Sequence, residues 1–296
     1  MRYACIDIGS NTTRLLVAEP RGPGLHDVCQ EKAFTQIGRG RDRTDPISAQ
    51  KVTQVARVVA AQAARARALE CTRLRIVATA AIRDAPNAGE LVAEIAGAAG
   101  EEVVVLAPED EARLAFAGAT ATWGPAVSAT VAVVDVGGGS SEIAVGTLAG
   151  GVAWWASLAI GSGVLADEHL CTDPPTPHEL AAVRHDVASV LADLDIPRPE
   201  QALAVGGSAT SLRRLCGGTL DADTLRRGAS EVAGGSSRDV AARLGLDPER
   251  VRLLPAGILL LAGIAERIGR PLQIANGGLR EGIVLELIAG AERLGR

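Results

Sequence analysis

One short pattern occurs twice in the chain, and this internal repeat limits the possible folds more than any other feature. Residues 7–17 (DIGSNTTRLLV) align without a gap with residues 135–145 (DVGGGSSEIAV). Each copy has an apolar strand that ends in aspartate, a glycine two positions later, a run of small or hydroxylated residues, and a second strand. The repeat predicts two related domains, each opening with a β-hairpin whose turn is rich in glycine and hydroxyl groups.

The rest of the sequence favours a two-domain α/β protein. The 296 residues are 47% hydrophobic and 22% charged, which is typical of a globular chain. We expect one domain over residues 1–123 and a second over residues 124–296, with the boundary near Trp123, Gly124 and Pro125. In an alternative arrangement, the last helix of the second domain packs back on the first domain. The two hairpin turns should face each other across a cleft.

Short β-rich runs alternate with alanine-rich segments, as in α/β proteins. Strands are predicted near residues 3–8, 14–19, 74–79, 103–106, 130–135, 142–147, 202–205 and 272–275. Helices are predicted near residues 48–69, 88–99, 109–121, 177–194, 208–216, 236–244, 255–269 and 279–291. One helix start is well marked, because Thr176, Pro177 and Glu179 combine an N-cap threonine, a proline at the first position and a capping-box glutamate.

Composition and charge argue against several classes of protein. A net charge of −5 and only 2% aromatic residues are unsuited to nucleic-acid binding, which uses basic patches and stacking. No apolar stretch reaches the roughly 18 residues of a membrane span, and Asp7 interrupts any secretory leader. The five cysteines are odd in number and contain no C-x-x-C pair, which indicates reduced thiols. We therefore expect a cytoplasmic protein with neither nucleic-acid nor membrane partners.

The two hairpin turns are chemically suited to binding phosphate. Turns built from glycine, serine and threonine bring backbone N–H groups together, and such groups bind anionic oxygens. The aspartates before them, Asp7 and Asp135, would repel phosphate unless Mg²⁺ (or Mn²⁺) lay between, because Mg²⁺ binds carboxylates and phosphate oxygens together. For either hairpin alone, a tight turn capped by its aspartate is the structural alternative. Two further glycine loops, residues 205–210 and 275–282, follow predicted strands and begin helices, where N–H groups also favour anions.

These motifs resemble those of the exopolyphosphatase/guanosine pentaphosphate phosphohydrolase family in its short two-domain form. The resemblance covers residues 7–17, 78–87, 108–118, 133–146, 157–162, 172–179, 205–210 and 276–282. It implies two duplicated actin-like (RNase H-like) domains of the actin-like, Hsp70-like and sugar-kinase ATPase superfamily, with an interdomain cleft. Residues 133–146 together with EAR at 111–113 are specific to the family, whereas the glycine loops alone fit the whole superfamily.

The resemblance also implies roles for individual residues. Glu111 would be the general base that activates water, with the adjacent Asp110 as the alternative. Asp135 and Glu142 would hold the divalent metal, together with Asp7. The residues implied to bind phosphate are Gly9, Ser10, Asn11, Arg83, Gly137, Gly138, Gly139, Ser140, Gly207 and Ser208. Phosphoanhydride cleavage depends mainly on positioning and charge neutralisation, and these residue types supply both.

The implied activity is Mg²⁺-dependent removal of the terminal phosphate from inorganic polyphosphate. Longer family members carry further C-terminal helical domains, so this shorter chain is expected to favour short polymers. Guanosine pentaphosphate is the second candidate substrate. A non-catalytic sensor of alarmone or polyphosphate and a sugar or acetate kinase are the remaining candidate functions. Arg39, Arg41 and Arg43 either contact an extended phosphate chain or form a solvated turn. A homodimer is the default expectation for a soluble enzyme.

Overall fold

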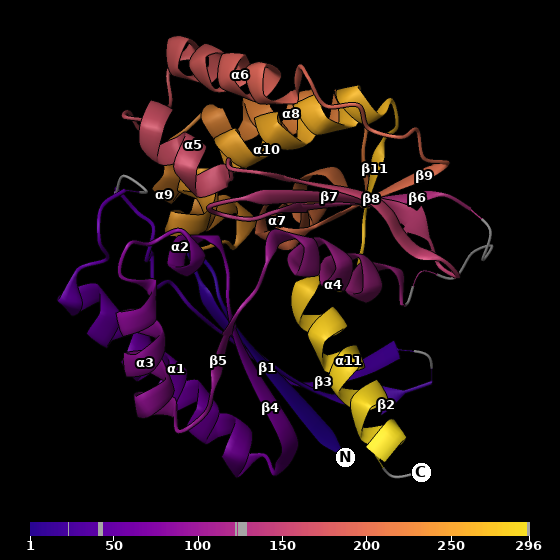
Figure 1. Ribbon diagram of the computed structural model, residues 1–296. Helices are drawn as coiled ribbons and strands as arrows, with labels where there is room; N and C mark the ends of the chain where they lie inside the picture. The colour runs from indigo at the N-terminus through magenta and orange to yellow at the C-terminus, as the bar shows by residue number, and fades with distance from the viewer. Residues whose placement is uncertain (23, 41–43, 122, 124–128, 295–296) are drawn as a thin grey trace. The chain divides into compact units, whose positions relative to one another are not determined.

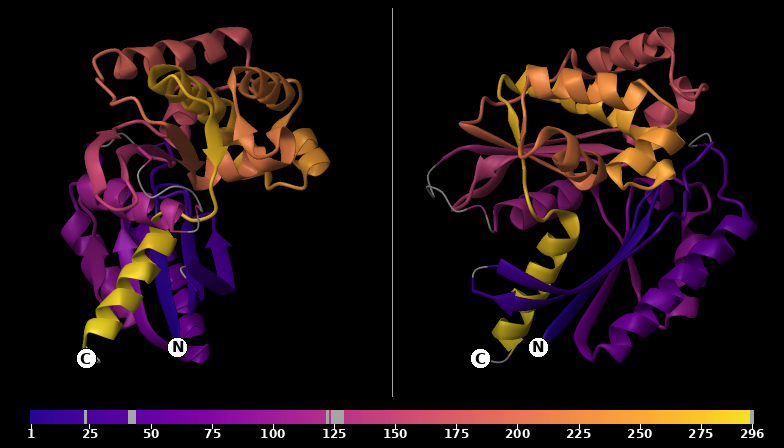
Figure 2. Two further views of the ribbon diagram at one scale, coloured as in Figure 1. Left: turned by 90° about the vertical axis from the view of Figure 1, so that its right-hand side faces the viewer. Right: turned by 180° about the vertical axis from the view of Figure 1, so that it is seen from behind.

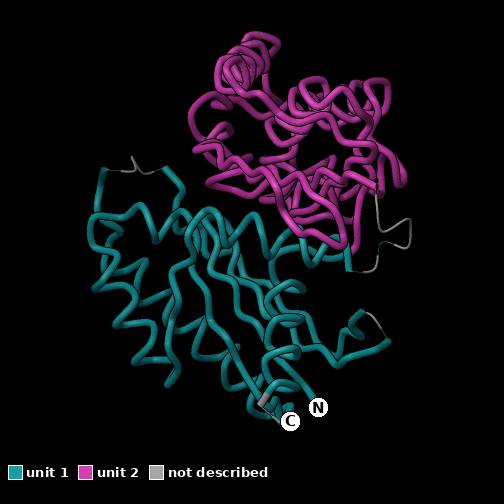
Figure 3. Tube along the Cα trace, turned by 45° about the vertical axis from the view of Figure 1, so that its right-hand side comes forward, with its two compact units in different colours: residues 1–123, 277–296 teal, residues 124–276 magenta. Residues whose placement is uncertain are grey.

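The computed structural model describes residues 1–22, 24–40, 44–121, 123 and 129–294. The chain forms two compact units (Figure 3). Unit 1 consists of Met1–Trp123 and Gly277–Arg296, and unit 2 of Gly124–Asn276. Residues 277–296 belong to unit 1, which is the alternative placement that the prediction allowed for the last helix, and not to the second domain. The predicted boundary residues Gly124 and Pro125 lie outside the described residues.

Unit 1 is built on a mixed sheet which, in the described residues, has five strands in the order β3-β2-β1-β4-β5 (Figure 1). Strand β2 runs antiparallel to β1 and β3, whereas β1, β4 and β5 run parallel to one another. The strands are β1 (Arg2–Ile8), β2 (Thr13–Arg21), β3 (Gly24–Ala33), β4 (Cys71–Ala78) and β5 (Val103–Val105). The helices are α1 (Ala49–Ala68), α2 (Ala80–Arg83), α3 (Ala88–Ala99), α4 (Pro108–Thr120) and α11 (Leu279–Leu294).

The alternation of side chains along β1 divides unit 1 into two cores. Ala4, Ile6 and Ile8 pack with α1 and α3 on one face of the sheet. Tyr3 and Cys5 point to the other face, where α4 and α11 lie (Figure 2). Because side chains in a strand alternate with a period of two, Asp7 belongs to the face with α4 and α11.

Unit 2 contains a mixed sheet with the strand order β10-β11-β9-β6-β7-β8, six strands in the described part of the chain. The strands are β6 (Val131–Val136), β7 (Ser141–Thr147), β8 (Gly151–Leu158), β9 (Gln201–Val205), β10 (Thr219–Leu220) and β11 (Leu272–Ile274). The helices are α5 (Ser162–His169), α6 (Pro177–Leu191), α7 (Gly206–Cys216), α8 (Ala222–Ala233), α9 (Ser237–Leu244) and α10 (Pro248–Ile268).

The two units share one arrangement of strands, as the sequence repeat predicts. The hairpin β1–β2 is matched by the hairpin β6–β7, and the parallel neighbour β4 is matched by β9. Helix α10 is buried along most of its length and forms the centre of the unit 2 core. The α/β fold class and the duplicated arrangement of strands are confirmed.

The predicted elements match the observed ones where the sequence carries strong local signals. The capping box of Thr176 and Glu179 is present at the start of α6. Helix α10 starts earlier than predicted: Asp247 caps it by accepting from the Glu249 N–H, and Pro255 lies inside the helix rather than at its start. Strand β3 was missed because most of its residues are exposed or half-buried, which removes the apolar alternation that identifies a strand.

None of the described helices combines the length and apolar character needed to cross a membrane. All five cysteines fall within the described residues and are free thiols, as their number predicts.

Helices α4 and α11 pack so closely that their backbones touch. A Cβ atom placed on Gly118 would lie 2.0 Å from the carbonyl oxygen of Gly278. A Cβ atom placed on Gly282 would lie 2.0 Å from the carbonyl oxygen of Leu114. Only glycine fits at these positions, and beside them Leu114 of α4 packs with Ile283 and Leu287 of α11.

Replacing Gly282 by alanine is expected to lower the free energy of unfolding by about 3 kcal/mol, because the new methyl group overlaps the backbone of α4. Gly290→Ala on the same helix is the matched control, since a Cβ atom there meets nothing within 4 Å. That control should be neutral or slightly stabilising, because alanine favours helix more than glycine does. Urea unfolding of both variants measures the difference, and equal stabilities would disprove the close approach.

Candidate active site

The predicted functional residues of unit 1 gather at one edge of its sheet. Strands β1, β4 and β5 are parallel, so their carboxyl ends lie at the same edge. The hairpin turn follows β1, Arg83 ends the short helix after β4, and Glu111 lies in the first turn of the helix after β5. Ligands of open α/β sheets bind at this edge, which makes it the candidate site of unit 1.

The turn between β1 and β2 is held in place by its own backbone and by the segment after β3. The Gly9 N–H donates to the Thr12 carbonyl at 3.0 Å, which closes the turn. The carbonyls of Ser10 and Asn11 accept from the N–H groups of Gly38 and Gln36, each also at 3.0 Å. The turn is therefore fixed before any ligand arrives.

Two buried polar atoms of this hairpin have no hydrogen-bond partner among the described residues. They are the Oδ1 atom of Asp7 and the Nδ2 atom of Asn11. One is an acceptor suited to a cation, and the other is a donor suited to an anionic oxygen. Buried polar groups in folded proteins are nearly always paired, so this exception indicates a place where a ligand completes the hydrogen bonding.

Burial raises the pKa of Asp7 above its usual value of 3.8, because desolvation disfavours the charged carboxylate. The positive charges of Arg280 and Arg14 oppose this rise, and the negative charge of Glu281 adds to it. A bound divalent cation would supply the missing stabilisation of the charged form.

Glu111 is only 5% exposed and forms an ion pair with Arg83. The Nη1 atom of Arg83 contacts the Glu111 carboxylate and also donates to the Leu106 carbonyl at 3.0 Å, while its Nε atom lies 3.4 Å from Asp84. About 20% of the Arg83 side chain is exposed, so its guanidinium is still accessible to a phosphate.

Asp110, the alternative base, points elsewhere. Its side chain is about half exposed and accepts a hydrogen bond from Arg113 at 3.2 Å. Glu111 and Asp110 are adjacent in α4 but lie on different sides of the helix, since successive helical residues are rotated by about 100°. This geometry favours Glu111, because it is the acid that lies beside Arg83.

In unit 2 the hairpin β6–β7 brings two predicted metal ligands together. Asp135 and Glu142 are directly opposite each other in the antiparallel register, so their side chains leave the same face of the sheet. Glu142 is 5% exposed, and Ser157 of β8 donates to its Oε1 atom at 3.0 Å. Like charges opposite each other in a sheet are destabilising, and a shared cation removes that penalty.

The turn after β6 is fixed by the start of α5. The N–H groups of Ser162 and Gly163 donate to the carbonyls of Gly137 and Gly138, each at 2.9 Å. The turn is closed by the Gly137 N–H, which donates to the Ser140 carbonyl at 3.1 Å. Helix α5 thus uses the carbonyl groups of the turn, which is the arrangement needed if N–H groups are to face an anion.

The loop after β9 lies against Asp135. Gly206 has a φ of +86°, and a Cβ atom there would lie 2.5 Å from the Asp135 Oδ1 atom. Gly207 packs against the guanidinium of Arg250, which is itself buried. A side chain at either glycine would displace a charged group, so this loop helps to fix Asp135.

Ser208 occupies an interior position. It is fully buried, and its hydroxyl faces Gly257 of α10, where a Cβ atom would lie 2.3 Å from the Ser208 Oγ atom. That Oγ atom has no hydrogen-bond partner among the described residues. In this structure Ser208 is therefore part of the packing beneath the loop rather than of its surface.

The two duplicated hairpins differ in what faces the aspartate. In unit 1 the residue opposite Asp7 is Arg14, and in unit 2 the residue opposite Asp135 is Glu142. Divalent cations of the Mg²⁺ type prefer two carboxylates and oxygen ligands, so the pair in unit 2 is the better cation site. The oxygen donors of Asp135 and Glu142 within unit 2 fit Mg²⁺ or Mn²⁺.

Sequence reasoning missed the residues that support the site. Ser157 and Gly206 act through contacts with Glu142 and Asp135 that only the strand register reveals. The position of Arg14 opposite Asp7 could have been predicted from the alignment of the two hairpins, in which Arg14 corresponds to Glu142. Of the basic residues considered for an extended chain, Arg39 is exposed, and Arg41 and Arg43 lie outside the described residues.

Two related α/β units, each opening with a glycine-containing hairpin after an aspartate, define a protein of the actin-like fold. Residues 16–290 match the pattern of the Ppx/GppA phosphatase family. Exopolyphosphatase 1 of Mycobacterium tuberculosis is 29% identical over 308 residues, covering 96% of this chain and 88% of the relative. Exopolyphosphatase 2 of the same organism is 29% identical over 317 residues, covering 97% and 98%.

A solved structure of the Ppx/GppA family member from Aquifex aeolicus has a TM-score of 0.82 to this chain at 26% identity, and the match covers 98% of both chains. The chain belongs to the Ppx/GppA phosphatase family.

Asp7→Asn is expected to raise the free energy of unfolding at neutral pH by about 1–3 kcal/mol in metal-free buffer, because it removes a desolvated charge whose Oδ1 atom has no hydrogen-bond partner among the described residues. The native pKa is raised, so wild type binds more protons when folded and loses stability as pH rises above 3.8 towards that pKa. The stability gained by the substitution should therefore vanish near pH 3.8 and below. Urea unfolding across pH tests this, and a gain independent of pH would contradict the burial of a charged Asp7.

Proposed function

We propose that the protein is an exopolyphosphatase that hydrolyses the terminal phosphoanhydride of inorganic polyphosphate with Mg²⁺ and an activated water. The observation that carries the proposal is the pair of buried, unpartnered atoms in the first hairpin, Asp7 Oδ1 and Asn11 Nδ2. The Asp7 oxygen suits a cation and the Asn11 nitrogen suits an anionic oxygen. A phosphate with a bound metal ion offers both partners together. The names of the M. tuberculosis relatives support the choice of substrate.

Glu111 is the proposed general base. Its carboxylate orients a water for in-line attack on the terminal phosphorus and accepts the proton as the new P–O bond forms. The bridging oxygen leaves with the shortened chain, and inorganic phosphate is the second product. Arg83 forms an ion pair with the Glu111 carboxylate, and its partly exposed guanidinium is available to neutralise the phosphate that is being released.

Asp135, Glu142 and Asp7 are the proposed metal-holding residues. A bound Mg²⁺ neutralises charge on phosphate oxygens and helps to orient the terminal phosphate. The contribution of the chain is to keep the ligand carboxylates in place: Ser157 fixes Glu142, and Gly206 leaves room for Asp135.

The two hairpin turns are the proposed phosphate cradles. Gly9, Ser10 and Asn11 form one, and residues 137–140 form the other. Gly207 belongs to the adjoining loop, whereas Ser208 supports that loop from within. All of these contacts serve the end of a polymer, so short chains are the proposed preferred substrates, with little gain in binding from added length.

Glu111→Gln is expected to lower kcat for phosphate release from short polyphosphate by about 10²–10⁴-fold, because the amide cannot accept the proton. Glu109→Gln is the matched control, since Glu109 lies in the same helical turn and is exposed. The control should retain wild-type turnover. A malachite-green assay at saturating substrate measures both, and wild-type turnover by the Glu111 variant would move the base to Asp110 or elsewhere.

Chelation of divalent metal is expected to abolish phosphate release, and Mg²⁺ should restore it in wild type but not in Glu142→Gln, because the variant removes one of the paired carboxylates. Short polyphosphate, long polyphosphate and guanosine pentaphosphate are compared in the same assay. Faster turnover of guanosine pentaphosphate would make it the substrate, and polyphosphate binding without release would identify a sensor. Full activity in chelator would contradict the metal requirement.

A further inference from the structure

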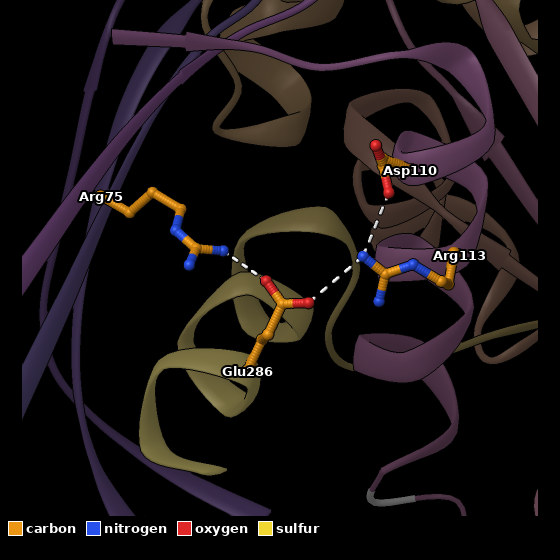
Figure 4. A network of polar contacts seen from close by, with 4 residues as sticks. All are labelled: Arg75, Asp110, Arg113 and Glu286. Carbon is orange, nitrogen blue, oxygen red and sulfur yellow. Dashed lines mark hydrogen bonds and ion pairs between the residues drawn. The ribbon is translucent and has the colours of Figure 1, made fainter. Parts of the chain in front are cut away.

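A second polar network lies on α4 away from Glu111. Glu286 of α11 receives hydrogen bonds from Arg75 of β4 and, at 3.2 Å, from Arg113 of α4 (Figure 4). Arg113 also donates to Asp110 at 3.2 Å. One carboxylate from the C-terminal helix therefore links α4 to the sheet of unit 1.

The network adds polar contacts to a helix pair that packs through glycines and apolar side chains. At Gly118 and Gly282 the two helices touch through backbone atoms. Leu114 of α4 packs in one buried cluster with Ile283 and Leu287 of α11, and apolar packing of this kind is non-directional. Arg113 and Glu286 add a directional contact that favours one rotation of α4 against α11.

The rotation of α4 sets the direction of Glu111. Asp110 precedes Glu111 in the first turn, and Arg113 binds both Asp110 and Glu286. A shift of α4 by a fraction of an ångström moves Glu111 relative to Arg83 and to any water it orients. Misplacement of a catalytic group by about 1 Å costs on the order of 10²-fold in rate, so a smaller shift is enough to matter.

The ion pairs around Glu286 are partly exposed, which argues against a role in folding stability alone. The network lines a groove of about 730 Å³ in unit 1, and the side chains of Arg113 and Asp110 are about half exposed. Partial burial acts to raise the pKa of Glu286, but the hydrogen bonds and charges of Arg75 and Arg113 outweigh it and lower the pKa. Ion pairs this exposed contribute little to folding, so their loss should leave the protein folded.

We propose that Glu286 is a positioning residue which, through Arg113 and Arg75, sets the rotation of α4 and so the alignment of Glu111. The inference rests on the proposed function, because it assumes that Glu111 is the base. According to this proposal, the rate of the chemical step also depends on a residue of α11 that lies outside the predicted site.

Glu286→Gln tests this directly in the 296-residue chain with Mg²⁺ and short polyphosphate. We expect kcat to fall about tenfold with KM within twofold of wild type, because the base is misaligned while phosphate binding is retained. Glu292→Gln is the matched control on the same helix, since Glu292 is exposed and has no partner in the part of the chain that the structure describes. The midpoint of thermal unfolding should be the same for both variants.

A mutant cycle with Glu111→Asp separates positioning from a general loss of structure. Glu111→Asp keeps a carboxylate but withdraws it by one methylene, so the base is already misaligned. Adding Glu286→Gln should then lower kcat by less than twofold. An unchanged kcat in Glu286→Gln, a rise in KM of similar size, or an equal tenfold loss in the Glu111→Asp background would each overturn the proposal. Wild-type turnover by Glu111→Gln would instead reject the proposed base, which is a separate result.

Discussion

Carboxylates placed near the carboxyl ends of strands are the constraint on which the rest of this structure depends. Asp7 ends β1 with an oxygen atom that accepts no hydrogen bond from any described group, and Asp135 faces Glu142 across the β6–β7 ladder. Both arrangements cost stability, because desolvation disfavours the charged Asp7 despite Arg280 and Arg14, and like charges lie opposite each other in the second. The rigid turns and well-packed sheets must therefore contribute enough to the free energy of unfolding to offset the cost of these two sites.

Duplication produced two hairpins with the same geometry and different chemistry. In one copy the residue across from the aspartate is Arg14, and in the other it is Glu142. The first copy can neutralise an anion, while the second concentrates negative charge for a cation. The same hairpin geometry thus carries opposite charges at one cross-strand position, which is Arg14 in unit 1 and Glu142 in unit 2.

The sequence predicted the parts of the molecule that depend on local signals. The repeated DxG hairpins, the α6 capping box and the α/β class all follow from short spacings, and the alternation of β1 is visible in its residues. Residues brought together over long separations were not predictable. Arg75, Arg113 and Glu286 come from three distant segments, and Gly118 and Gly282 are ordinary helical glycines until their helices meet. Ser208 looked like part of a phosphate loop, and only the packing of α10 shows that its hydroxyl points inward.

Unit 1 is assembled from two pieces of chain that emerge from the ribosome at different times. All of Gly124–Asn276 is synthesised before α11, so unit 2 is complete while unit 1 still lacks the helix that covers one face of its sheet. Domains generally fold as they become available during translation. The apolar face formed by Tyr3, Cys5 and Leu16 is therefore not fully covered until Ile283 and Val284 of α11 have been synthesised. Completion of unit 1 is consequently coupled to the synthesis of α11, which follows that of all of unit 2.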